Sequence, residues 1–207
     1  MLRRIKNAQR GDTLIEVLFA FTVLSLVVVG AMTIMNQGTI ASQRALETTF
    51  VRQEIDSQAT TLRFLHDAYV ASFIPGATYE ATTPAGQWAK MSAEMTATTA
   101  SSFDGSDTCP TPPTGSFIMN TATATYVAGT QAILIPAVTS SQVTYTSNTV
   151  KNAEGIWIEG VKSAVSADVN KKNVRYIDFH IRACWQNPGE GLAMRIGTIV
   201  RLYEPQN

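Results

Sequence analysis

The sequence is poor in the residues that build metal sites and charged binding surfaces. Its 207 residues include two cysteines and two histidines, too few for a zinc site with four such ligands. Charged residues make up 15% of the chain, against about 25% in an ordinary soluble domain. The sixteen basic and sixteen acidic side chains cancel. This balance disfavours a nucleic-acid binder that relies on positive charge, so no nucleic-acid partner is predicted.

Sequence motifs of catalytic sites are also absent. The chain has no nucleophile elbow, phosphate-binding loop or metal-binding motif. His66 and His180 lie far apart in the sequence, and each is interpreted as a lone surface histidine. Asp104 and Asp107 resemble a calcium loop only weakly, and an ordinary turn explains them better. We therefore predict that the protein is not an enzyme and has no cofactor and no metal.

The N-terminus carries the strongest pattern in the sequence. The first eleven residues contain four basic side chains and no acidic one, whereas residues 12–207 hold twelve basic and sixteen acidic side chains. Val17–Met35 then runs for nineteen residues without a charge. As a helix this run would span about 28 Å, close to the hydrocarbon core of a bilayer. The positive-inside rule predicts a cytoplasmic N-terminus, with the chain after Met35 outside.

Three ordinary interpretations compete for this segment: a cleaved secretory signal, a plain signal anchor and a buried core helix. The uncharged run exceeds the roughly 7–15 residues of a signal sequence, and the flanking positive charges disfavour a core helix. None of the three explains Glu16. A carboxylate in a lipid-facing helix is costly unless it lies at the interface or has a partner. A helix N-terminus would also favour this anion.

The N-terminal segment resembles the processing site of type IV prepilins and pseudopilins. The resemblance rests on the basic leader, Gly11, the run Thr13–Leu18 and the long apolar stretch. In that family a membrane-embedded prepilin peptidase cuts after the glycine and methylates the new amine. The resemblance therefore implies cleavage between Gly11 and Asp12, methylation at Asp12, and Glu16 as the fifth residue of the mature chain.

Two positions depart from the family pattern. Asp12 stands where the family usually has phenylalanine or another apolar residue, and Thr33 stands where major pilins often have proline. The resemblance implies three partners: prepilin peptidase, other pilin subunits through the N-terminal helix, and the lipid bilayer. In such a bundle Glu16 would pair with the N-terminal amine of a neighbouring subunit. Breaking a buried pair from one side costs roughly 3–5 kcal/mol.

The helix is expected to continue beyond the membrane. No proline occurs between Thr39 and Phe73, and Pro75-Gly76 is a clear stop. One side of this stretch forms an apolar stripe with a single polar member: Val51, Ile55, Gln58, Leu62, Leu65, Tyr69 and Phe73. The pattern predicts one long helix, about residues 13–73. Two helices broken at Asn36–Gly38 are the alternative.

The remainder of the chain reads as sheet. Residues 76–150 are rich in threonine and serine, which suit strands and turns. Alternating apolar residues predict an antiparallel hairpin of Ile177–Trp185 and Met194–Leu202, with a turn at 187–191. Other expected strands or extended segments are Gly115–Pro136, Gln142–Thr149 and Gly155–Ser163. The predicted fold is α+β and pilin-like: a long N-terminal helix packed on an antiparallel sheet, as the resemblance also implies.

Cys109 and Cys184 are the only cysteines. Because the domain is predicted outside the membrane, where oxidation is permitted, we favour a disulfide between them over two free thiols. The bond would close a loop of about seventy-five residues and add roughly 4 kcal/mol in the chain-entropy model. Trp88, Trp157 and Trp185 are interpreted as core aromatics rather than an adhesive surface.

These patterns predict four segments: a cleaved leader (1–11), a membrane-spanning helix half (12–38), an amphipathic helix half (39–75) and a β-sheet head (76–207). The functional hypothesis is a minor type IV pilin-like subunit, anchored in the membrane and then assembled into an extracellular or periplasmic pilus or pseudopilus. The alternative is a membrane-anchored domain with binding or enzymatic activity that uses the helix only as a tether.

Overall fold

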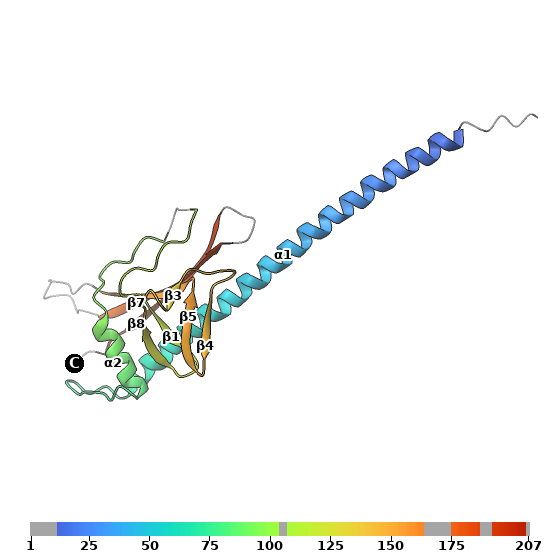
Figure 1. Ribbon diagram of the computed structural model, residues 1–207. Coiled ribbons are helices and arrows are strands. Elements are labelled where there is room, and N and C mark those ends of the chain that lie inside the picture. Colours follow the sequence, from blue (N-terminus) through green and yellow to red (C-terminus); the bar gives the residue numbers. More distant parts are fainter. Residues whose placement is uncertain (1–11, 104–106, 164–174, 187–191, 206–207) are drawn as a thin grey trace, which may run out of the picture. The chain divides into compact units, whose positions relative to one another are not determined.

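The computed structural model describes residues 12–103, 107–163, 175–186 and 192–205. The chain divides into two compact units, Met1–Leu46 and Glu47–Asn207. Helix α1 is 60 residues long and covers Asp12–Ala71 (Figure 1). It continues without interruption through Asn36–Gly38, so the single helix expected from the sequence is confirmed and the two-helix alternative is wrong.

The unit Glu47–Asn207 contains two sheets and the short helix α2 (Pro84–Glu94). The larger sheet is antiparallel throughout and has the order β2-β1-β6-β7-β8; the smaller one has the order β3-β5-β4, with β3 parallel to β5. The strands are β1 (Phe117–Asn120), β2 (Thr125–Ala128), β3 (Leu134–Ile135), β4 (Gln142–Thr146), β5 (Thr149–Glu154), β6 (Ile156–Lys162), β7 (Tyr176–Gln186) and β8 (Ala193–Tyr203). The predicted α+β architecture is therefore confirmed.

The C-terminal hairpin follows the alternation seen in the sequence. Strands β7 and β8 pair antiparallel from Tyr176 opposite Tyr203 to Gln186 opposite Ala193. Ile177, Phe179 and Ile181 of β7 are fully buried in the core. The intervening residues lie on the opposite face of the sheet, called the outer face below. The turn predicted at 187–191 lies outside the described residues.

The predicted stripe of α1 supplies its share of the core of the second unit. Val51, Ile55, Leu62 and Leu65 are at most 3% exposed. The residues Trp88, Trp157 and Trp185 are each 1% exposed. The interpretation of the three tryptophans as core residues is confirmed. Gln58, the polar member of the stripe, is also fully buried, because its side-chain amide makes hydrogen bonds with the main chain of Met119 in β1.

Helix α2 corrects the prediction that residues 76–150 contain only strands and loops. Thr83 caps this helix, with its hydroxyl oxygen accepting a hydrogen bond from the Gly86 N–H at 3.1 Å, and Pro84 occupies the first turn. Trp88 and Met91 lie on its buried side. In the sequence, a Thr-Pro pair followed by apolar residues three positions apart indicates a helix. The high threonine and serine content around it obscured this signal.

Candidate functional site

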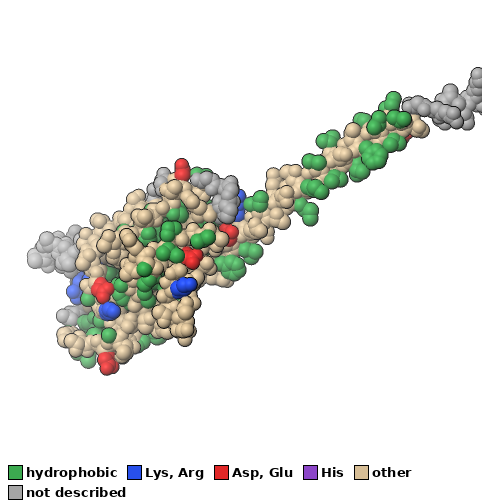
Figure 2. All heavy atoms as spheres, viewed as in Figure 1, with side chains coloured by type: hydrophobic (Ala, Val, Ile, Leu, Met, Phe, Trp, Pro, Cys, Tyr) green, Lys and Arg blue, Asp and Glu red, His purple; other side chains and the backbone are tan. Residues whose placement is uncertain are grey.

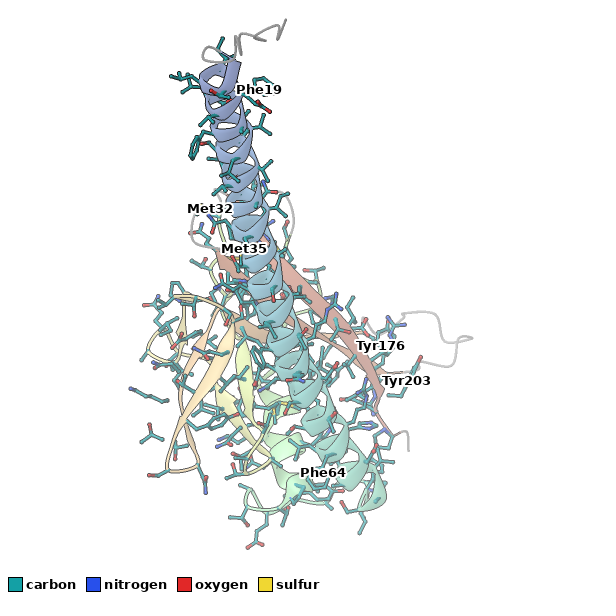
Figure 3. The ribbon with its side chains drawn as sticks, turned by 90° about the vertical axis from the view of Figure 1, so that its right-hand side faces the viewer. Phe19, Met32, Met35, Phe64, Tyr176 and Tyr203 are labelled. Carbon is teal, nitrogen blue, oxygen red and sulfur yellow. A yellow bond between two sulfur atoms is a disulfide. The ribbon has the colours of Figure 1, made fainter. Side chains whose placement is uncertain are left out.

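The N-terminal part of α1 exposes apolar side chains all round. Between Leu14 and Met35 the large apolar residues are 43–74% exposed. Phe19, Met32 and Met35 project from the helix in Figure 3, and Figure 2 shows hydrophobic side chains along the same segment. Among the described residues, α1 is the one helix long and apolar enough to cross a membrane. Exposing this apolar surface to water is unfavourable, so lipid or other apolar helices are expected to surround it.

The hydroxyl groups in this segment are bonded within the helix. Thr22, Ser25 and Thr33 donate hydrogen bonds to main-chain carbonyls three or four residues earlier, at 2.7, 2.8 and 2.9 Å. Each hydroxyl proton therefore has an acceptor without water, as a helix surrounded by hydrocarbon requires. Thr33, at the family's proline position, keeps α1 continuous rather than bending it.

The sequence-predicted processing residues lie at the start of α1. Asp12 is the first helical residue, and Glu16 follows one turn later with its side chain exposed. Gly11 and the basic leader lie outside the described residues. The salt bridges found among the described residues do not involve Glu16. Since a lone carboxylate in an apolar surrounding is costly, a partner for Glu16 would have to come from outside the described helix.

A disulfide joins Cys109 and Cys184, the pair favoured in the sequence analysis, with their Cα atoms 5.6 Å apart. Cys184 is a fully buried residue of β7. Cys109 belongs to an irregular segment, residues 97–103 and 107–115, which we call the strap. The strap is also attached to β6 by a hydrogen bond from the Lys162 N–H to the Ala97 carbonyl at 2.9 Å.

A buried ion pair on the outer face holds the strap at Ser101. Glu159 and Arg182 are each 6% exposed, and their charged groups lie 3.1 Å apart. Glu159 accepts hydrogen bonds from the Ser101 N–H and hydroxyl, both at 2.8 Å. Arg182 donates to the Ser101 hydroxyl oxygen at 2.7 Å and to its carbonyl at 2.9 Å. All three polar groups of Ser101 are thus bonded, and both charges are compensated.

A second ion pair lies near the open end of the hairpin. Arg201 donates two hydrogen bonds of 2.7 Å to the Asp178 carboxylate and lies 4.0 Å from the ring centre of Tyr176. The Tyr176 and Tyr203 rings are 6.0 Å apart and lie side by side in Figure 3. The hydrogen bonds from Arg201 hold the pKa of the Asp178 carboxyl below its usual value.

The two histidines occupy different environments. His66 departs from the surface position expected for it: its side chain is 12% exposed, and its Nε2 lies 2.9 Å from the Tyr203 carbonyl. Its ring also packs edge-on against Trp88 at 4.9 Å. His180 is half-buried on the outer face; burial and the charge of Arg182 lower the pKa of its imidazole. In the described ranges no three His, Cys, Asp or Glu side chains gather as a metal site would require.

The N-terminal segment matches a known family. Residues 6–32 match the family model of the prokaryotic N-terminal methylation motif. Together with the long apolar helix, this match supports a type IV pilin-like, prepilin-type protein. No curated protein and no solved structure gives a significant match to the chain.

Proposed function

We propose that this chain is a minor type IV pilin-like subunit, which is inserted in the membrane, processed by prepilin peptidase and assembled into a pilus or pseudopilus. The proposal rests on the overlap of two features in the N-terminal segment. The methylation motif at 6–32 overlaps the part of α1 that is exposed on all sides, has no charge over Val17–Met35 and has Glu16 one turn after its start.

Processing would separate the leader, residues 1–11, from the mature chain. Cleavage between Gly11 and Asp12 creates a new amine on Asp12, and the methylation named by the motif would fall on that amine. The cut also removes all four basic residues of the leader. Glu16 then lies one helical turn from a positive N-terminus.

Residues 12–38 would cross the bilayer with the N-terminus on the cytoplasmic side, because the basic leader precedes the apolar run. Residues 39–75 and the head, 76–207, would then lie outside, as the Cys109–Cys184 disulfide also favours. On assembly, Glu16 of one subunit would pair with the N-terminal amine of a neighbour. That contact would compensate both charges inside a bundle of apolar helices.

The role proposed for the head is structural rather than catalytic. The methylation motif is typical of filament subunits, which act by assembly. The polar groups of Ser101, Glu159 and Arg182 on the outer face are engaged in holding the strap. Each therefore has a stabilising contact that accounts for its burial.

The direct test is the N-terminal sequence and intact mass of the mature protein isolated from membranes. The proposal predicts a chain that begins at Asp12 and carries the mass of one additional methyl group. A mature chain that retains Arg3 and Arg4 would contradict it and favour the alternative, in which the helix only tethers a binding or enzymatic domain.

A further inference from the structure

A preformed pocket of about 490 Å³ lies in the unit Glu47–Asn207, beside the disulfide. Its walls are the strap from Cys109 to Gly115, the loop 129–131 and the segment Leu134–Pro136; Gly155, Trp157 and Cys184 also line it. The volume is within the range of roughly 300–1,000 Å³ found for small-molecule sites. The pocket therefore has room for a small organic ligand.

The walls of this pocket are stiff. The disulfide fixes Cys109, and Pro110, Pro112, Pro113 and Pro136 restrict the main chain on both sides. Gly155 has φ +62°, and a Cβ there would lie 2.3 Å from the Cys184 carbonyl oxygen, so the main chain is packed closely at this point. Because the walls are already ordered, the protein loses little conformational entropy when a ligand binds.

The chemistry of the lining selects the class of ligand. Among the described residues that line it, none is acidic, basic or histidine, so a charged group placed beside them would lose water without gaining a counter-ion. Leu134 and Ile135 are half-buried and present apolar surface, whereas Trp157 and Cys184 are almost completely buried and close the pocket behind them. The pocket therefore favours a neutral ligand with one apolar face.

The lining also includes exposed residues with hydrogen-bonding side chains. Thr111, Thr114, Thr130 and Gln131 line it and are exposed; three hydroxyls and one amide can each donate and accept. A neutral pyranose has the matching arrangement, with an apolar C–H face and hydroxyl groups at its edge. We propose that this pocket binds a neutral saccharide, whose C–H face lies on the apolar surface and whose hydroxyls bond to the threonine and glutamine side chains.

The experiment uses the full chain in a detergent without a sugar headgroup, so that the detergent does not compete. Saturation-transfer NMR is recorded with the methyl glycosides of glucose, galactose, mannose and N-acetylglucosamine, and with glucuronate and glucosamine as charged counterparts. We expect saturable transfer to at least one neutral glycoside and none to the charged sugars. Binding of no neutral glycoside, or equal binding of glucuronate, would overturn the proposal.

Two variants locate the site. Thr130→Val and Gln131→Leu remove one polar group each, and each should weaken binding roughly three- to tenfold, the value of one hydrogen bond. Thr149→Val, which removes an exposed hydroxyl of β5 away from the lining residues, is the matched control and should bind as wild type. If Thr149→Val weakened binding as much as Thr130→Val, the saccharide would not bind in this pocket. Neither result depends on how the N-terminus is processed, so this inference and the filament proposal fail independently.

Discussion

Gln58 of α1 pairs with the main chain of Met119 in β1 as a neighbouring strand would. Its Nε2 donates to the Met119 carbonyl at 3.1 Å, and its Oε1 accepts from the Met119 N–H at 2.9 Å. Both residues are fully buried. The apolar stripe of α1 is non-directional, whereas this pair of bonds fixes one position of the helix along the strand.

Replacing Gln58 should therefore destabilise the head more than the change in side-chain volume alone would. Gln58→Leu leaves the Met119 N–H and carbonyl buried without partners, at a cost of about 2–3 kcal/mol. The measurement is denaturant unfolding of the full chain in detergent, monitored by the fluorescence of the buried tryptophans. Gln53→Leu, at an exposed position of the same helix, is the control. Equal losses in both variants would show that the Met119 bonds contribute nothing specific.

The disulfide should be a major source of stability. Cys109 and Cys184 are 75 positions apart, and in the chain-entropy model closing such a loop stabilises the folded state by roughly 4 kcal/mol. Reductant should lower the melting temperature of the wild-type head and slow its migration in a denaturing gel. The double variant Cys109→Ser/Cys184→Ser should have the lower melting temperature of the reduced wild type, and reductant should not change it. Two thiols that react with an alkylating agent in native wild-type protein would rule out the bond.

Stability should fall at acidic pH through Asp178. Because its pKa in the folded protein lies below the unfolded value of about 3.9, the Asp178–Arg201 pair stabilises the fold above that value. This contribution is lost as the pH falls through the folded pKa. The melting temperature of wild type should exceed that of Asp178→Asn at pH 6, and the difference should shrink by pH 3. Asp56→Asn, an exposed site on α1, controls for the loss of one negative charge.

Glu16→Ala should separate assembly from insertion. Alanine keeps the helix and the apolar run, so the variant should enter the membrane, be cleaved and fold. It should be depleted from sheared filaments relative to the membrane pool, because a neighbour's N-terminal amine would lack its partner. A role limited to the helix end predicts a loss of only about 0.3–1 kcal/mol in helix stability and near-normal assembly. Wild-type incorporation would therefore contradict the pairing.

Gly11→Val should block maturation. We expect a bulky β-branched side chain before the cleaved bond to prevent the peptidase from accommodating the site. The longer, unmethylated precursor should accumulate in the membrane and be visible by intact mass. Normal maturation of Gly11→Val would exclude prepilin-type processing.

The sequence predicted the elements whose periodicity is strong. The alternation in Ile177–Trp185 and the apolar stripe of α1 both place their apolar side chains in the core, and both predictions were confirmed. Alternation did not reveal that Ile181–Trp185 is buried on both faces of the sheet. Helix α2 was missed because its eleven residues lie in a threonine- and serine-rich region, where the cap at Thr83 was the main local signal.

The contacts of single polar residues could not be predicted in the same way. Ser101 is 58 positions from Glu159 and 81 from Arg182, and local sequence carries no information about which distant groups will meet. Gln58 appeared in the sequence as an irregularity in an apolar stripe, and its reason is a strand 61 residues away. The pocket is lined by five separate parts of the sequence, none of which has a motif of its own.

The strap also bears on how heads can crowd together. Strand β8 is an edge strand, whose unpaired main-chain groups can form hydrogen bonds with a strand of another chain. The strap covers the beginning of that edge: the Asp107 carbonyl accepts from the Ala193 N–H at 3.1 Å, and the Thr108 carbonyl accepts from Arg195 at 2.8 Å. Near the other end, Arg201 places a charge beside it. If the chain assembles as proposed, neighbouring heads could therefore pack closely without pairing their sheets through the β8 edge.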